Sequence, residues 1–297
     1  MTARTFAVRA AAFAAVMVAI LAASYLVVRP WCLAWGTKED EARRSLPGES
    51  LVYDAGSQET HAITIHAPLD AVWPWLAQLG QDRGGFYSFD LLENAVGCEM
   101  PTEDRLRPDR QAWQVGDRLW MYPEDRAGGI GFATLRVLVP GRALAFATRA
   151  PGTRLTEPEN GSWAFVLEPI DAETTRLIVR GRVIAGRSAV ARAFDASLFG
   201  PMHFVMERRM MTGIKELAEG SDRGRLTNHV AVALWIVAAG QIITAAILVF
   251  RRPRWTRPLA GLAASALTFE LLTLVQPPLL AGCACVAGVG VILARRA

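Results

Sequence analysis

His203 is the residue whose type and surroundings best suit chemistry. It follows Phe199 by four residues and precedes Met206 by three, so on an α-helix it borders a stripe of apolar side chains. A histidine in that position could carry a proton or orient a carbonyl group, and Glu207, one helical turn later, could orient its ring. The alternative is a histidine that is only hydrogen-bonded at the edge of a helix.

The glycine-rich segment GQDRGGFYS (residues 80–88) is the second candidate. Arg83 could pair with an anionic head group, and the Tyr87 hydroxyl is another candidate for proton transfer. The alternative is that Arg83 pairs with acidic residues nearby and that the glycines serve only a turn. The segment is not a phosphate loop, because it lacks GxxxxGK and no strand precedes it.

The elements that must position these side chains are indicated by hydrophobic periodicity, which is two residues in a strand and 3.6 in a helix. The expected strands are Thr60–Ala67, Asp117–Tyr122, Thr134–Val139, Ala143–Thr148, Ser162–Glu168 and Arg176–Ile184. The expected helices are Leu69–Leu79, Phe89–Val96 and Val190–Ala218. Clean alternation predicts an antiparallel sheet with one face in water. His61 shares a strand face with Ile63 and Ile65, so it is expected to point inward.

The last helix carries the apolar stripe Phe199, Met202, Met206, Met210, Ile214 and Leu217, which is expected to face the sheet. A curved sheet wrapped around a long helix leaves a cavity, which an apolar small molecule could fill. The residues predicted to line it are Arg83, Tyr87, Phe199, Met202, His203, Met206 and Met210. The alternative for the methionines is ordinary core packing.

The sequence predicts neither a metal site nor a cofactor. No two histidines have ligand spacing within one element, and the four cysteines form no CxxC pair. No nucleotide motif and no Ser-His-Asp set is recognisable. A net charge of +4, with arginines scattered among acidic residues, argues against a nucleic-acid partner.

Four apolar runs predict membrane helices: Ala10–Val28, Val230–Phe250, Leu259–Val275 and Leu279–Ala294. The last two runs are short, so the number of spans is either three or four. For the first run, the alternative is a cleaved signal peptide. Arginines cluster at both termini and in residues 251–257, so with four spans the positive-inside rule places these in the cytoplasm and the central domain outside. Glu270, inside a run, is expected to be protonated or hydrogen-bonded to another helix, near Gln241.

The central region resembles the START-like superfamily of polyketide cyclase/dehydrase and lipid-transport proteins, and within it a membrane-anchored bacterial subgroup of unknown function. The resemblance covers about residues 58–219. It rests on the segments ITIHAPLDAVWPWLAQLG, GGFYSFDLLENAVG, WAFVLEP, TRLIVRGR and HFVMERRMMTGIKELAE. It implies an α+β helix-grip domain, an antiparallel sheet wrapped on a long C-terminal helix, but not one function, because the superfamily includes binding proteins, transfer proteins and enzymes.

The sequence therefore predicts an anchor (1–36), a START-like domain (37–220) and C-terminal membrane helices (221–297). The expected function is binding of a lipid or other apolar small molecule at the cell membrane. A tethered domain suits such a ligand, because apolar molecules concentrate in the bilayer. The alternatives are a cyclase- or dehydrase-type enzyme that uses the same cavity, and a sensory or scaffold role.

Overall fold

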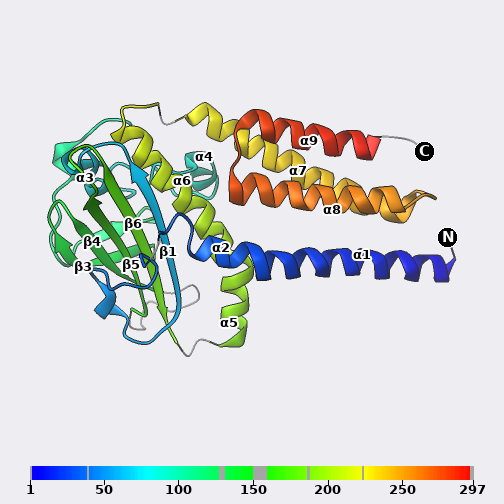
Figure 1. Cartoon of the computed structure of the whole chain (residues 1–297), viewed down its shortest axis with the longest axis horizontal. Coiled ribbons are helices and arrows are strands. Elements are labelled where there is room, and N and C mark those ends of the chain that lie inside the picture. Colours follow the sequence, from blue (N-terminus) through cyan, green and yellow to red (C-terminus); the bar gives the residue numbers. More distant parts are fainter. Residues whose placement is uncertain are drawn as a thin grey trace. The chain divides into compact units, whose positions relative to one another are not determined.

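The computed structural model describes residues 2–38, 40–126, 131–149, 159–185, 188–222 and 224–294. The chain divides into two compact units (Figure 1). Met1–Pro30 and Gly224–Ala297 form one, which we call the helical unit. Trp31–Arg223 form the other, which we call the sheet unit.

The sheet unit is built on a six-stranded antiparallel sheet with the order β1-β6-β5-β4-β3-β2. Its strands are β1 (Ala55–Ile65), β2 (Arg118–Trp120), β3 (Phe132–Val139), β4 (Ala143–Thr148), β5 (Gly161–Pro169) and β6 (Thr175–Ile184). Each overlaps a strand expected from alternation, and the antiparallel prediction is confirmed. Because β1 pairs with β6, the first strand lies beside the last, and Glu59 lies opposite Gly181.

The helices of the sheet unit are α3 (Leu69–Ala77), α4 (Asp90–Ala95), α5 (Ala189–Phe194), a π-helical turn η4 (Asp195–Phe199) and α6 (Gly200–Ala218), with short 3-10 turns η2 (Glu49–Leu51) and η3 (Pro108–Arg110). The long helix expected over Val190–Ala218 is thus present as α5, η4 and α6 in succession. Pro201 explains the π turn before it, since proline has no N–H to bond the carbonyl four residues earlier.

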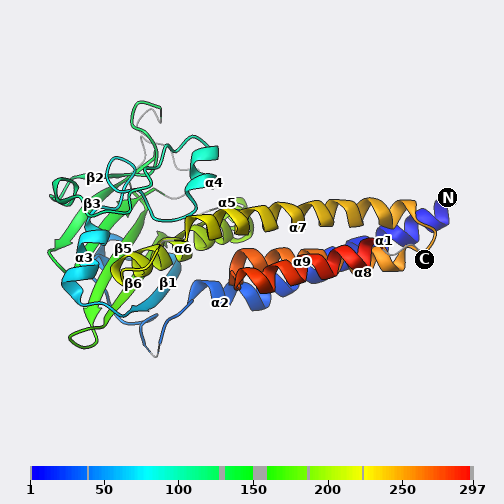
Figure 2. The same ribbon diagram turned by 90° about the horizontal axis from the view of Figure 1, so that it is seen from above.

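Helix α6 lies along one face of the sheet, with α3 beside it (Figures 1 and 2). Buried residues of both layers form one core, to which α6 contributes Met210, Met211 and Ile214 and the sheet contributes Phe165 and Val179. This is the helix-grip arrangement that the order of the elements predicts.

The opposite face of the sheet is covered over β1 and β6, and the expectation that it is in water is wrong for these strands. Residues 36–38 and 40–52 lie there: Arg176 donates to both carboxylate oxygens of Glu41, at 2.8 and 2.7 Å, and Arg180 donates to the Glu41 carbonyl at 2.6 Å. Arg180 is only 2% exposed, and Leu46 is buried in a small core cluster on this face. Alternation of arginine with apolar residues cannot distinguish a face in water from one covered by a polar segment.

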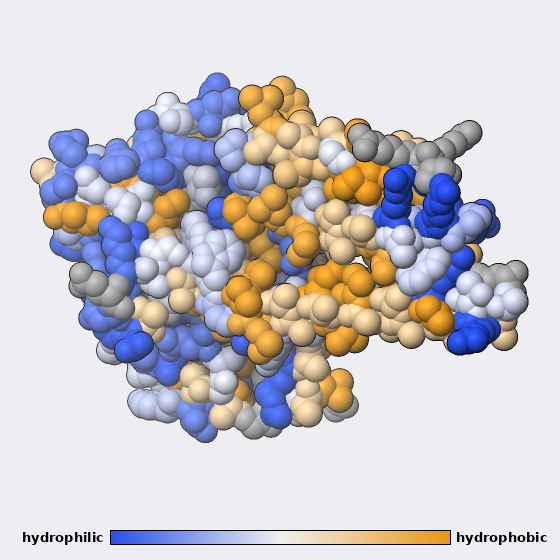
Figure 3. Space-filling view, turned by 45° about the vertical axis from the view of Figure 1, so that its right-hand side comes forward, coloured by the Kyte–Doolittle hydropathy of each residue, from blue (hydrophilic) through white to orange (hydrophobic). Residues whose placement is uncertain are grey.

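The helical unit contains α1 (Ala3–Ala23), a π-helical turn η1 (Ser24–Val28), the start of α2 (Arg29–Leu33), α7 (Arg225–Arg251), α8 (Thr256–Glu270), a π-helical turn η5 (Leu271–Val275) and α9 (Leu279–Ala294). Three helical stretches are long and apolar enough to cross a membrane: Ala3–Leu33, Arg225–Arg251 and Thr256–Val275. The apolar α9 is shorter. In Figure 3 the surface along these helices is largely apolar, whereas that of the sheet unit is largely hydrophilic.

Within the helical unit, the buried Arg9 of α1 donates hydrogen bonds to the carbonyls of Val249, Phe250 and Pro253. A cation at the end of α7 stabilises the carbonyls that the helix leaves without partners. The start of α1 and the arginine-rich loop after α7 therefore lie at the same end of this unit. Which side of a membrane they occupy stays a prediction, and Arg295 and Arg296 lie outside the described residues.

Glu270 has a different partner from the one expected. Its carboxylate accepts a hydrogen bond from the Ser24 hydroxyl, next to α1, whereas Gln241 donates to the Val286 carbonyl. The sequence could not indicate this partner, because it depends on how α1 and α8 are packed. The contact agrees with a hydrogen-bonded glutamate that faces another helix.

Candidate functional site

Five side chains meet between the sheet and α6, and we call them the His–Glu cluster. They are Glu59 and His61 of β1, Trp163 of β5, and His203 and Glu207 of α6. Side chains alternate along a strand, so Glu59 and His61 share the face that carries Ile63 and Ile65. On α6, positions 203 and 207 are one turn apart and lie on the same side.

Glu207 forms the buried base of the cluster. Trp163 donates its indole N–H to Oε2 of Glu207 at 2.6 Å, and Oε1 is hydrogen-bonded to Nδ1 of His61. Nε2 of His61 lies 2.8 Å from the carbonyl of Cys32. A carbonyl only accepts, so we assign a proton to Nε2, and Nδ1 can donate to Glu207 only if it is protonated too. The geometry therefore indicates an imidazolium–carboxylate pair.

The electrostatics of His61 agree with this assignment. Burial alone would lower its pKa, but the charge of Glu207 and the hydrogen bond to it outweigh burial, and the pKa is raised from its ordinary value. Both side chains of the pair are almost inaccessible to solvent. A buried pair of this kind is stable only when its remaining polar atoms are satisfied, which Trp163 and Cys32 accomplish.

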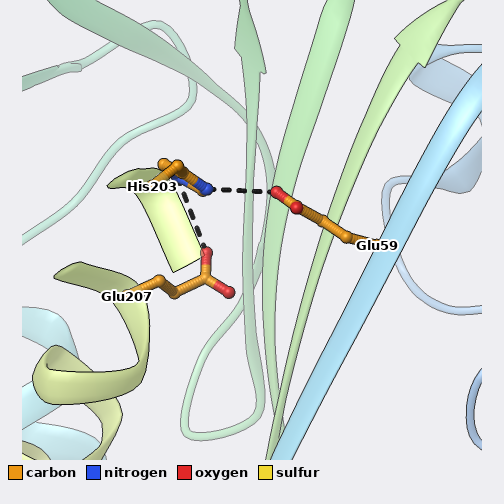
Figure 4. Close-up of side chains that lie close together, drawn as sticks. All are labelled: Glu59, His203 and Glu207. Atoms are coloured by element: carbon orange, nitrogen blue, oxygen red, sulfur yellow. Dashed lines mark ion pairs between the residues drawn. The ribbon is translucent and has the colours of Figure 1, made fainter. Parts of the chain in front are cut away.

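His203 lies at the accessible end of the cluster, between two carboxylates (Figure 4). Its Nδ1 is 3.1 Å from Oε1 of Glu59, and its Nε2 is 3.8 Å from Oε2 of Glu207. Nδ1 is buried, and its 3.1 Å contact with Glu59 does not have the geometry of a well-directed hydrogen bond. The side chain as a whole is 26% exposed.

These charges set the protonation of His203. Burial would lower its pKa, but Glu59, with smaller contributions from Glu207 and Asp195, raises the pKa from 6.5 to about 9. His203 is therefore an imidazolium at neutral pH. With both carboxylates ionised, the cluster holds two positive and two negative charges and is neutral overall.

Gly181 makes room for Glu59. A Cβ atom there would lie 2.9 Å from Oε1 and 3.2 Å from Cγ of Glu59. We expect Gly181→Ala to displace the Glu59 carboxylate from His203 and to lower the pKa of His203 from about 9 towards 6.5. NMR titration of the histidine ring measures this shift. In a Glu59→Gln background the same substitution should leave the pKa unchanged; an equal shift in both backgrounds would contradict the role given to Gly181.

Exposed apolar side chains lead up to His203 along the first half of the long helix. The ring of Phe199 stacks on the His203 ring at 13°, with centroids 5.7 Å apart. Phe199 is 38% exposed and Met202 60% exposed. We call the following residues the apolar strip: Val190, Phe194, Leu198, Phe199 and Met202. A polar cluster and an apolar surface therefore adjoin at His203.

The methionine stripe does not face the sheet along its whole length. Met202 is exposed, Met206 is half-buried, and only Met210 belongs to the core. Instead, the buried residues in the first half of α6 are Phe204, Val205, Glu207 and Arg209. The buried face therefore does not follow the methionines there, and it includes Glu207, which is held by Trp163 and His61. An apolar stripe could not reveal a buried glutamate.

Arg83 and Tyr87 have structural partners away from the cluster. Arg83 donates to the carbonyls of Arg110 and Ala112, and its guanidinium lies 3.7 Å from the centre of the Trp113 ring. The Tyr87 hydroxyl is fully buried and donates to the Trp75 carbonyl at 3.2 Å. Arg83 was predicted to bind the ligand, with pairing to nearby acidic residues as the alternative, and the structure instead shows these carbonyls as its hydrogen-bond partners. Of the residues proposed from the sequence, the structure brings His203, Glu207 and His61 together.

Sequence reasoning missed Glu59 and Trp163. Glu59 lies two residues before His61 on the same strand, so extending the alternation by one step places it on the same face. Trp163 lies in the expected strand Ser162–Glu168, but the alternation of that strand does not show that its indole N–H contacts a buried glutamate. Glu59, Gly181 and Trp163 lie side by side on β1, β6 and β5. This arrangement depends on the register of the three strands, which the sequence does not show.

No protein-family model matches the chain, and no curated protein matches it in sequence. Several solved structures resemble part of it, and three of them serve as examples. A protein from Mesorhizobium loti is 16% identical, with a TM-score of 0.31, over 56% of this chain and 99% of that one. A polyketide cyclase-like protein from Corynebacterium glutamicum is 17% identical, with a TM-score of 0.26, over 54% and 86%. The Zhui aromatase/cyclase from a Streptomyces species is 19% identical, with a TM-score of 0.27, over 55% and 92%.

The sheet unit has a helix-grip fold, which rests on the strand order and the long terminal helix. With TM-scores below 0.5, the likenesses to solved structures carry no argument. What the chain does must be argued from the His–Glu cluster and its surroundings.

Proposed function

We propose that the chain is a membrane-anchored START-like protein that binds a lipid or another amphiphilic small molecule. In this proposal the His–Glu cluster takes the polar group of the ligand, and the apolar strip contacts its hydrocarbon part. The observation that carries the proposal is the position of His203, a partly exposed imidazolium that joins a buried charge network to exposed apolar side chains.

The charges of the cluster favour a neutral polar group, such as a hydroxyl or a carbonyl. Because the cluster is neutral overall, a charged head group would add an uncompensated charge. A hydroxyl can donate to Glu59 and accept from His203, and a carbonyl can accept from His203. Arg83, which the sequence suggested for an anionic head group, is engaged by backbone carbonyls and by Trp113.

A location at the membrane would also suit the binding of an amphiphile. Trp31, at the start of the sheet unit, lies near the end of the apolar helical stretch Ala3–Leu33, and tryptophan is enriched where such a helix leaves the bilayer. Its ring packs edge-on against Phe204, with centroids 5.6 Å apart, and Phe204 follows His203 in the chain. The cluster and Trp31 are therefore near each other within the sheet unit.

A photoreactive long-chain alcohol tests the proposal on the full chain in lipid nanodiscs. After irradiation, labelled peptides should include Phe199 and Met202. In His203→Ala the labelling affinity at this position should fall about 10- to 100-fold, since a hydrogen bond to a charged group contributes roughly 1.5–3 kcal/mol. His66→Ala, which changes an exposed histidine outside the cluster, is the matched control. Label confined to the apolar helices, or unaffected by His203→Ala, would contradict the proposal.

The protonation of His203 favours one second candidate, an enzyme of the cyclase or dehydrase type. An imidazolium held between two carboxylates can donate a proton to a bound carbonyl oxygen and recover it through Glu59. Such an enzyme would lose turnover but retain ligand in His203→Gln. A binding protein would show no turnover in either form.

A further inference from the structure

The His–Glu cluster has the composition of a metal centre. Glu59, His203 and Glu207 each offer one ligand atom, and these three atoms lie within 4.8 Å of one another. We propose that the three side chains bind a first-row divalent cation such as Zn²⁺. At least one coordination position would be left for water or for an oxygen of a ligand.

The donor types suit this ion. Imidazole nitrogen and carboxylate oxygen bind Zn²⁺ at about 2.0–2.2 Å, and sites with three protein donors and an open position are typical of functional zinc centres. Bonds of that length place tetrahedral donors about 3.4 Å apart. Only one ring nitrogen of His203 can bind the ion, and the three ligand atoms lie within 4.8 Å of one another, so side-chain rotations are needed to close the site.

The surroundings hold two of the donors in place. Trp163 and His61 both donate to Glu207, as the outer partners of ligating carboxylates do. Gly181 leaves the space that the Glu59 carboxylate occupies. A site assembled this way is formed before the ion arrives, which favours tight binding.

Access permits a cation as well. Zn²⁺ would take the place of the proton on one ring nitrogen of His203, between the two carboxylates, and Nδ1 lies 3.1 Å from Glu59 without a well-directed hydrogen bond. Glu59 is 21% exposed and His203 26% exposed, so an ion can enter and a water ligand can be accommodated.

No metal site was predicted, because no two histidines have ligand spacing within one element. The ligands proposed here are one histidine and one glutamate, four residues apart on α6, and a second glutamate from β1. Two of them share a helix face, but the third is distant in the chain and is brought close only by the fold.

Calorimetric titration of the metal-stripped full chain in detergent with ZnCl₂ tests the site without any amphiphile. We expect one Zn²⁺ per chain and at least about tenfold weaker binding in both His203→Ala and Glu59→Gln. The controls His66→Ala and Glu173→Gln, at exposed positions, should bind as the parent does. Equal affinity in all forms, or no binding by the parent, would overturn the inference.

X-ray absorption at the zinc edge of the parent protein gives a readout that does not depend on folded variants. A shell of nitrogen and oxygen alone is expected, and a sulfur shell would overturn the assignment, because the chain has four free cysteines. Alcohol labelling is repeated with a chelator present. If the protein does not bind zinc but is still labelled by the alcohol, only the proposed metal site is wrong. If it binds zinc but is not labelled, only the proposed binding of an amphiphile is wrong.

Discussion

Glu207→Ala is expected to lower the free energy of unfolding of the sheet unit by about 3–5 kcal/mol, the usual effect of removing one partner from a buried ion pair. The substitution leaves the His61 imidazolium buried without its counter-ion and the Trp163 N–H without its acceptor. Urea denaturation of the full chain in detergent, followed by tryptophan fluorescence, measures the loss.

Two variants calibrate that result. Glu219→Ala breaks an i,i+4 pair with Lys215 on the same helix and should cost about 1 kcal/mol or less. Glu207→Gln keeps an oxygen that can accept from Trp163 but removes the charge, so its cost should lie between the other two. If Glu207→Ala costs no more than Glu219→Ala, the buried pair does not exist in solution.

Stability of the metal-free protein should fall as the pH rises from about 6.5 to 9. The pKa of His203 is raised from 6.5 to about 9 on folding, so its contribution is fully present below pH 6.5 and is lost as the pH passes through the folded-state pKa. A shift of this size corresponds to about 3 kcal/mol as an upper limit, because the ring is partly exposed. The pKa of His61 is raised as well, so it acts in the same direction.

The free energy of unfolding, measured at pH 6 and at pH 9 with a chelator present, tests this pH dependence. The difference should shrink in Glu59→Gln, because Glu59 is the main group that raises the pKa of His203. Equal stability at the two pH values, or a difference that is as large in Glu59→Gln as in the parent, would show that Glu59 does not hold His203 in its charged form.

Much of the fold could be predicted from periodicity, because each strand and helix has to present an apolar face. The strand Ala143–Thr148 and the helix Leu279–Ala294 have the bounds that were expected. What periodicity could not show is which polar residues are buried. Arg180 and Glu207 both occupy positions that an apolar criterion assigns to solvent, and both are buried because specific partners satisfy them.

Periodicity could predict even less of the candidate site. Placing His61 inward required only the alternation of one strand, and His203 with Glu207 required only the turn of one helix. That His61 of β1 lies next to His203 and Glu207 of α6 depends on the register of β1 against β6 and on the rotation of α6 about its axis. Both are set by long-range packing, so the stripe of methionines gave the wrong rotation for the first half of α6.

The most direct test of amphiphile binding is mass spectrometry of the small molecules extracted from the full chain, purified in parallel with His203→Ala and Glu59→Gln from the same membranes. The proposal predicts that one amphiphile with a neutral polar group is equimolar with the parent protein and depleted in both variants. If all three samples carry the same lipids in the proportions of the surrounding membrane, the His–Glu cluster does not hold such a ligand.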